Sequence, residues 1–282
     1  MNRRAFLVQS AAFALACAAP SLAFAQSGRR APFQPTRFSV QVVGSGPDVL
    51  LIPGLTSGRQ VWRRAVGAVP GYRYHLLQVA GFAGDPARGN GDGPVVAPLV
   101  EEIARYVSAS GIGRAAVIGH SMGGTVGMIL AARHPQLVER LMVVDMTPQP
   151  TSLYGGAMGS QLARGLQSMV SRREGRQLLS GLIAAFTPPA AADARSDPDV
   201  VARAMHDLGT IDLTGDLPRI RAPLTVLYAS QSGEARGSAD RSFTAAYANA
   251  RGARLVRIDD SGHMIMADQP DRFAREMRDF LR

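Results

Sequence analysis

A serine framed by glycines, in the pentapeptide GHSMG at residues 119–123, constrains the fold of this chain more than any other stretch. An apolar run precedes it, and a segment with helix-like composition follows it. A serine at a sharp turn between strand and helix forces neighbouring main chain together, so the positions two before and two after it tolerate little more than a hydrogen. Gly119 and Gly123 meet that demand. The pentapeptide therefore predicts a tight strand-turn-helix connection with Ser121 at its tip.

Short apolar runs alternate with segments of helical spacing along most of the chain. Residues 95–110 place apolar side chains at helical spacing and end at Gly111, a common helix stop. Alternation of strand and helix favours an α/β fold with a mostly parallel sheet and helices on both faces. The predicted strands are residues 37–43, 48–52, 72–79, 115–118, 140–144, 223–229 and 253–258, and the other predicted core helices are residues 125–133, 238–250 and one that begins at Pro270.

The pattern changes between residues 147 and 219, where no strand signal is found. Helix-like pieces at residues 160–170, 175–186 and 199–208 alternate there with Pro- and Gly-containing breaks. Such an insertion would lie over the sheet edge as a helical lid. The length of 282 residues suits one large α/β domain. The predicted organisation is a core of residues 37–146 and 220–282, a lid of residues 147–219, a flexible stretch at residues 26–36 and a signal peptide at residues 1–25.

The first 25 residues have the features of a secretory signal. Arg3 and Arg4 precede an apolar run, and small residues at 23–25 form a cleavage site before Gln26. The arginine pair resembles the twin-arginine export signal of bacteria. The apolar run is shorter than a bilayer requires, and the spacing around Cys17 does not suit a lipid anchor. We therefore expect a periplasmic or secreted protein without a stable membrane anchor.

Composition excludes several classes of function. All 31 basic residues are arginine, and the formal net charge is +9, but the arginines are scattered without interleaved aromatic residues. Nucleic-acid binding is therefore not predicted. The histidines and carboxylates have no metal-binding spacing, and the glycine-rich loop at residues 81–93 lacks the lysine of a phosphate-binding loop. No metal or other cofactor is expected.

Catalysis by Ser121 would need a base, almost always histidine, and an acid group that orients the base. His263 follows the last predicted strand, where a chain at the carboxyl edge of a parallel sheet can reach back to the serine turn. It is therefore the predicted base. The other four histidines occupy less suitable places: His120 beside the serine with its ring expected to point elsewhere, His75 in a strand, His134 at a helix end and His206 in the lid.

The chain resembles the alpha/beta-hydrolase family. The resemblance is carried by the GHSMGG sequence at residues 119–124, by His263 after a glycine, and by the early loop with Pro53-Gly54 and Trp62. It implies a sheet of about eight strands, a nucleophile on the fifth strand and a lid inserted after the sixth. It also implies an oxyanion hole formed by the backbone N–H groups of Leu55 and Met122. Pro53 replaces a histidine common in the family.

The third catalytic partner is less clearly indicated. The family commonly places an aspartate in the loop after the strand at residues 223–229, where this chain has Ser232. Asp145, directly after the strand at residues 140–144, is one alternative, because some relatives place their acid there. Glu234 is a displaced carboxylate in the usual loop, and Asp240 is more distant. Asp145 could equally cap the segment that follows it.

Ser121 distinguishes this chain from dehalogenases and epoxide hydrolases of the same fold, which attack with aspartate. The sequence therefore predicts an exported serine hydrolase that cleaves small-molecule carboxylic esters through an acyl-enzyme intermediate. Hydrolysis of carbon-carbon bonds, lactone opening and perhydrolysis remain alternatives that use the same residues. A non-catalytic binding protein is a further alternative, because Ser232 occupies the usual position of the acid.

Overall fold

A seven-stranded sheet forms the centre of the computed structural model, which describes residues 33–154, 195–231 and 235–282. The strand order is β1-β3-β2-β4-β5-β6-β7. β1 runs antiparallel to β3, and every other neighbouring pair is parallel. The predicted fold class is confirmed. The strands are β1 (Phe38–Val43), β2 (Asp48–Ile52), β3 (Arg73–Val79), β4 (Ala115–His120), β5 (Val138–Val144), β6 (Leu224–Ser230) and β7 (Arg254–Asp259).

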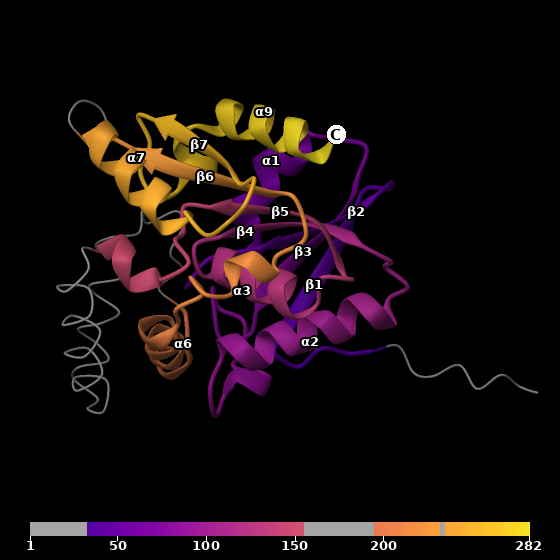
Figure 1. Ribbon diagram of the computed structural model, residues 1–282. Helices are drawn as coiled ribbons and strands as arrows, with labels where there is room; N and C mark the ends of the chain where they lie inside the picture. The colour runs from indigo at the N-terminus through magenta and orange to yellow at the C-terminus, as the bar shows by residue number, and fades with distance from the viewer. Residues whose placement is uncertain (1–32, 155–194, 232–234) are drawn as a thin grey trace, which may run out of the picture. The chain divides into compact units, whose positions relative to one another are not determined.

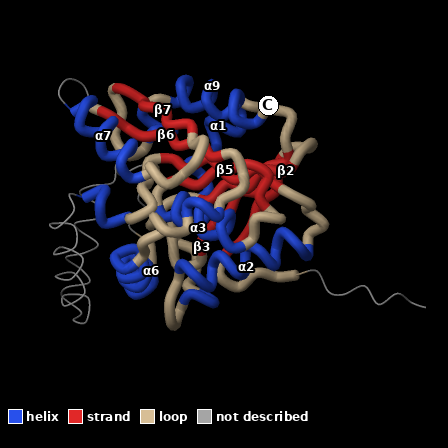
Figure 2. Tube along the Cα trace, in the orientation of Figure 1, coloured by secondary structure: helices blue, strands red, loops and turns tan. Residues whose placement is uncertain are grey.

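Helices cover both faces of this sheet, as Figures 1 and 2 show. One buried cluster joins the sheet to α1 (Arg63–Ala68), α8 (Ile265–Asp268) and α9 (Pro270–Leu281). A second cluster, on the other face, joins it to α2 (Val96–Ala109) and α3 (Met122–Arg133). The remaining described helices are α6 (Pro198–Thr210), α7 (Ala235–Ala246) and the short 3-10 turns η1 (Arg59–Trp62), η2 (Arg88–Asn90), η3 (Pro150–Tyr154) and η4 (Leu217–Arg219).

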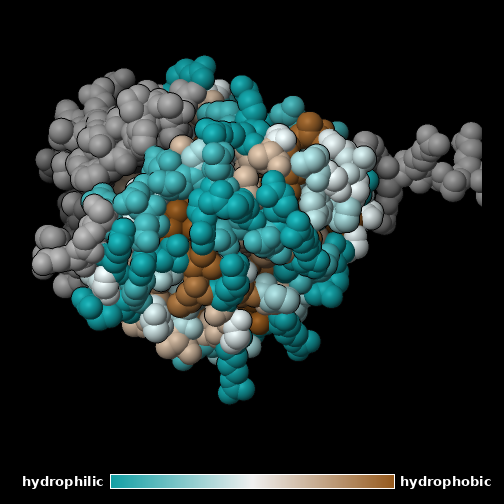
Figure 3. All heavy atoms as spheres, turned by 90° about the horizontal axis from the view of Figure 1, so that it is seen from above, coloured by the Kyte–Doolittle hydropathy of each residue, from teal (hydrophilic) through white to brown (hydrophobic). Residues whose placement is uncertain are grey.

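The two helices α3 and α9 differ in the way they are buried. The first ten residues of α3 are all buried, because this helix packs between the sheet, α2 and η4. α9 begins with Pro270 in its first turn, as predicted, and buries one face that includes Phe273, Met277 and Phe280. Its arginines and aspartates lie on the other side. Figure 3 views the molecule from the side of α9, and the surface there is mostly hydrophilic with narrow hydrophobic strips.

The strand count and the position of the insertion are each one lower than the resemblance implies, which is compatible with the expected fold. The described residues contain seven strands rather than about eight, and the inserted segment follows β5 rather than a sixth strand. The helix predicted at residues 199–208 is α6, and the helix predicted at residues 238–250 is α7, which begins three residues earlier. The lid helices predicted at residues 160–170 and 175–186, and the signal peptide at residues 1–25, lie outside the described residues. Within those described, no helix has the length and apolar character needed to span a membrane.

A partly buried polar cluster fixes the start of β2 against β3. The carboxylate of Asp48 accepts two hydrogen bonds from Arg73, at 2.5 and 2.8 Å. Nε2 of His75 lies 2.8 Å from the same carboxylate, and its Nδ1 lies 2.8 Å from the Tyr106 hydroxyl. The hydrogen bonds from Arg73 outweigh the opposing effect of burial and lower the pKa of Asp48 below its ordinary value.

We expect Asp48→Asn to lower the free energy of unfolding near neutral pH by about 1–3 kcal/mol, because the amide cannot replace the charged acceptor. The native pKa of Asp48 is depressed, so its stabilising effect is present above the unfolded-state pKa and is lost as pH falls through the native value. Urea unfolding at several pH values measures this. The gap between the two proteins should be full at pH 7 and should narrow below about pH 4. A gap that widens on acidification would contradict this explanation.

Candidate active site

Ser121 stands at the turn between β4 and α3 in a strained backbone conformation. Its φ is 54° and its ψ is −123°, in a region that L residues rarely adopt. Its N–H donates to the Val144 carbonyl at 2.9 Å, and its own carbonyl accepts from the Gly124 N–H at 2.7 Å. These bonds hold the strained residue between two neighbouring strands and the first turn of α3. The strand-turn-helix connection predicted from residues 119–123 is present.

The two framing glycines lie where the main chain is crowded. A Cβ at Gly119 would lie 2.1 Å from the Gly123 carbonyl oxygen, and a Cβ at Gly123 would lie 2.2 Å from the Ile52 carbonyl oxygen. Both obstacles are main-chain atoms, which cannot rotate away as a flexible side chain can. Glycine is therefore required at both positions, as predicted from the sequence. Gly123 also allows α3 to approach the end of β2.

Gly123→Ala should lower the free energy of unfolding by at least about 2 kcal/mol, because the methyl group would push α3 away from β2. The higher helix propensity of alanine offsets only about 1 kcal/mol of this. Gly113→Ala is the matched control, since a Cβ there meets nothing within 4 Å. Thermal unfolding of both variants tests the prediction. Equal melting temperatures for the two variants would show that the site has more room than the structure indicates.

His263 and Asp145 form a hydrogen-bonded pair. Nδ1 of His263 lies 2.7 Å from Oδ2 of Asp145, and the Ala229 N–H donates to Oδ1 at 2.8 Å. The Asp145 side chain is 10% exposed and that of His263 is 34% exposed. Asp145 follows β5 directly, with a φ of 51°. The carboxylate is thus fixed on both oxygens, while the imidazole remains open to solvent.

Asp240, the most distant of the predicted carboxylates, has other partners in the structure. The Asp240 carboxylate accepts from the Tyr228 hydroxyl at 2.6 Å and forms an ion pair with Arg257. Glu234 lies outside the described residues, so its place in the site stays a prediction. Of Asp145 and Asp240, the structure therefore brings only Asp145 to His263.

Three of the other histidines lie away from this pair. His75 belongs to the Asp48 cluster, His134 lies 3.0 Å from Glu101, and His206 is exposed on α6. The expected orientation of the His120 ring was wrong. The ring does not point away from the site but lies 4.7 Å from the His263 ring, measured between centroids. Sequence reasoning missed this contact because it joins residues 143 positions apart.

The two predicted oxyanion donors belong to segments that adjoin Ser121. Leu55 is in the loop after β2, and Met122 is the first residue of α3. An α-helix leaves the N–H groups of its first turn without a carbonyl partner inside the helix, so the Met122 N–H has the character of an anion-binding donor. The early loop passes close to the serine, because a Cβ at Gly54 would lie 3.0 Å from the Ser121 Cβ. Their role in an oxyanion hole stays a prediction.

A family model described as the alpha/beta hydrolase family matches residues 49–276, most of the chain. The chain belongs to this family. The pimeloyl-[acyl-carrier protein] methyl ester esterase of Vibrio atlanticus is 28% identical over 214 residues, which cover 68% of this chain and 79% of that protein.

Solved structures agree on the fold of this alpha/beta hydrolase. The enol-lactonase of Burkholderia xenovorans LB400 aligns with a TM-score of 0.70 and 22% identity, over 87% of this chain and 96% of that one. A thermophilic esterase of Thermogutta terrifontis aligns with a TM-score of 0.69 and 21% identity, over 86% of this chain and 92% of that one. At this level of identity these two likenesses establish the fold alone.

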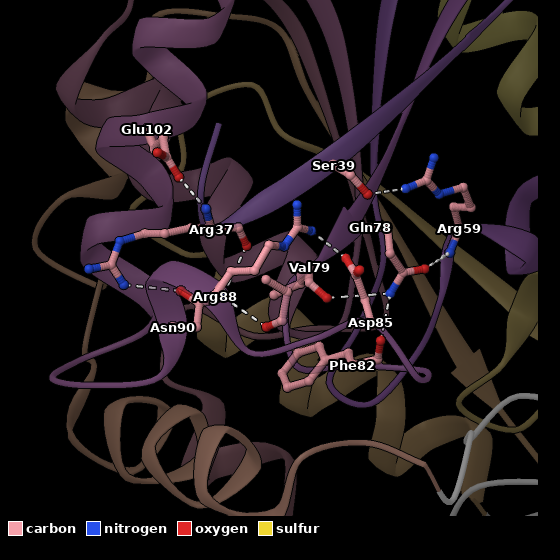
Figure 4. A network of polar contacts seen from close by, with 11 residues as sticks. Arg37, Ser39, Arg59, Gln78, Val79, Phe82, Asp85, Arg88, Asn90 and Glu102 are labelled. Carbon is pink, nitrogen blue, oxygen red and sulfur yellow. Dashed lines mark hydrogen bonds and ion pairs between the residues drawn. The ribbon is translucent and has the colours of Figure 1, made fainter. Parts of the chain in front are cut away.

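A polar network of the hydrolase anchors the chain that follows the early loop (Figure 4). The Arg59 N–H donates to Oε1 of Gln78 at 3.0 Å, and Nε2 of Gln78 donates to the Phe82 carbonyl at 2.9 Å. The guanidinium of Arg59 also donates to the Ser39 hydroxyl on β1. Gln78 therefore ties the end of the early loop to the loop after β3, which limits the movement of both.

A second contact joins the early loop to the segment that precedes α6. The Ser196 hydroxyl accepts from the Ala83 N–H at 3.0 Å and donates to the Thr56 carbonyl at 3.4 Å. The Asp197 N–H donates to the Gly81 carbonyl at 2.7 Å. The early loop is therefore held from two sides, by Gln78 and by Ser196. Across the described ranges, no group of three or more histidine, cysteine or acidic residues could hold a metal ion.

Proposed function

We propose that this alpha/beta hydrolase is an exported serine hydrolase that cleaves carboxylic esters of small molecules through an acyl-enzyme intermediate. The observation that carries the proposal is the 2.7 Å contact between Nδ1 of His263 and Oδ2 of Asp145. The same imidazole contacts the ring of His120, the residue before Ser121. The histidine–carboxylate pair supports the proposal, because a serine that acts with such a pair is the machinery of acyl transfer on many folds.

In the proposed reaction, Oγ of Ser121 attacks the ester carbonyl carbon as Nε2 of His263 takes the hydroxyl proton. The carbonyl oxygen becomes an oxyanion, which the N–H groups of Leu55 and Met122 stabilise. Collapse of this intermediate breaks the bond to the alkoxy oxygen, and the alcohol leaves with the proton from His263. Water then attacks the acyl-serine by the same steps, which releases the carboxylic acid and restores Ser121.

Asp145 orients the base in this scheme. A carboxylate only accepts hydrogen bonds, so the bond to Asp145 requires the proton on Nδ1 of His263 and leaves the Nε2 lone pair free for the serine proton. When the imidazole becomes protonated, the adjacent carboxylate stabilises its charge. The Ala229 N–H holds the other carboxylate oxygen, so the acid cannot rotate away from the histidine.

The substrate class is inferred from the relatives and the nucleophile. Serine attack suits acyl groups, and the Vibrio atlanticus relative is a methyl ester esterase. A lactone is a cyclic ester, so its opening would follow the same steps. The twin-arginine-like start at residues 1–25 supports a location in the periplasm or outside the cell.

A substrate panel tests the proposed activity. Purified protein is assayed with p-nitrophenyl acetate, butyrate and octanoate, with a simple γ-lactone, with a carbon-carbon hydrolase substrate of the dicarbonyl type, and for peracid formation from acetate and hydrogen peroxide. We expect the highest kcat/KM for one of the esters. Faster turnover of the dicarbonyl or peracid substrates would reassign the bond type. Folded protein that turns over none of them would favour the non-catalytic binding alternative.

A further inference from the structure

The imidazole of His120 contacts two parts of the proposed catalytic machinery. His120 ends β4 and is 1% exposed. Its Nε2 lies 2.9 Å from the main-chain carbonyl oxygen of His263, and the two rings are tilted by 48°. On its other side, a Cβ at Gly54 would lie 2.9 Å from Nδ1. The ring therefore fills the space between the loop of the predicted base and the early loop.

The protonation state of this ring follows from its contacts. A carbonyl oxygen can only accept, so Nε2 of His120 must carry the proton that it donates to His263. Burial, with a smaller contribution from the nearby His263, lowers the pKa of His120 to about 3. The ring is therefore neutral at working pH, and Nδ1 is an unprotonated nitrogen. Within the described residues this buried Nδ1 has no hydrogen-bond partner.

An unpartnered buried nitrogen costs stability, so an apolar side chain would serve better if this position only filled space. The one hydrogen bond that the His120 side chain makes within the described residues is its bond to the His263 main chain. His263 is thus held at two points, by Asp145 at its ring and by His120 at its carbonyl. The bond to Asp145 orients the imidazole, whereas the bond from His120 holds the His263 main chain itself, in a loop that is also bound through the N–H groups of Ser261 and Gly262.

We propose that His120 is a positioning residue, which holds the His263 main chain at the correct distance from Ser121 while its ring supports the early loop at Gly54. This inference rests on the proposed function, since it assigns a role in the same acyl transfer. Because His120 is neutral, it adds no second positive charge beside His263 when that imidazole takes the serine proton. A displacement of about 1 Å in such a group can lower the rate about a hundredfold.

Two variants of nearly equal volume isolate the hydrogen bond. Glutamine reaches as far as the imidazole and ends in an N–H donor, whereas methionine has a similar length and ends in a methyl group. We measure kcat and KM with p-nitrophenyl butyrate, the second-order rate of labelling by a fluorophosphonate, and the melting temperature. His120→Met should lower kcat and the labelling rate about tenfold or more with little change in KM. His120→Gln should stay within about threefold of the unaltered protein.

Each outcome decides the inference. Equal rates for the Gln and Met variants would overturn it, because the donated hydrogen bond would then have no effect. An equal loss of rate in both, accompanied by an equal fall in melting temperature, would assign His120 to packing alone. Unaltered protein that neither reacts with the fluorophosphonate nor hydrolyses the ester would overturn the proposed function itself. Reaction of the unaltered protein with no difference between the variants would overturn only the role of His120.

Discussion

Ser121→Ala is expected to reduce kcat for p-nitrophenyl butyrate by about 10⁴-fold or more, because removal of the nucleophile from a serine-histidine-acid triad leaves only the residual effect of binding and oxyanion stabilisation. The substitution removes one oxygen from a residue that is 6% exposed. The backbone strain at Ser121, with its φ of 54°, remains for alanine. The fold should therefore persist, and the loss should be in kcat rather than in protein yield.

A matched control accompanies this measurement. Ser108→Ala removes the hydroxyl of an exposed serine on α2 whose Oγ donates to the Ala104 carbonyl one turn earlier. It should retain full activity and nearly the same melting temperature. Circular dichroism of all three proteins verifies folding. If folded Ser121→Ala protein kept more than about a tenth of the activity, another group would have to be the nucleophile.

Asp145→Asn is expected to reduce kcat by about 10³–10⁴-fold, because an amide no longer requires the His263 tautomer with its proton on Nδ1. The amide has nearly the same shape, so its oxygen can still accept from the Ala229 N–H. KM should change little, since Asp145 is nine-tenths buried behind the imidazole. Ester hydrolysis by the purified variant, measured from pH 5 to pH 10, gives both parameters.

Glu234→Gln provides the comparison that separates the two predicted acids. If Asp145 orients His263, this variant should remain within about threefold of the unaltered protein. The opposite result, with Glu234→Gln inactive and Asp145→Asn active, would move the acid to the loop after β6. Asp240→Asn completes the series, because Asp240 is the third carboxylate considered. We expect this variant to lower stability, through loss of the bond from the Tyr228 hydroxyl, and to leave kcat unchanged.

Local sequence patterns predicted the fold because each pattern depends on neighbours in the chain. Continuous apolar runs gave the buried parallel strands, and glycines at 119 and 123 gave the turn. The position of His263 after the last strand was enough to predict that it lies near the serine turn, since parallel strands end at one edge. The family resemblance implied about eight strands, and the periodicity alone predicted seven, the number found in the described residues.

The acid and the role of His120 could not be decided from the sequence. Asp145 and His263 are separated by 118 positions, and which carboxylate meets the imidazole depends on how the chain leaves β5 with a positive φ. Amino-acid composition and periodicity do not predict which carboxylate reaches the imidazole. The same holds for the contact between His120 and the His263 carbonyl, and for the bonds that Gln78 makes to Arg59 and Phe82. These are long-range contacts between side chain and main chain, which periodicity does not encode.

In the proposed reaction, Ser121 forms a covalent acyl-enzyme with the help of His263. This role of Ser121 is tested most directly by treating the folded protein with a fluorophosphonate and mapping the adduct by peptide mass spectrometry. We expect one equivalent of label, located on Ser121, and strongly slowed labelling when His263 is replaced by alanine. Label on a different residue, or folded protein that takes up no label, would contradict the assignment of this serine as the nucleophile.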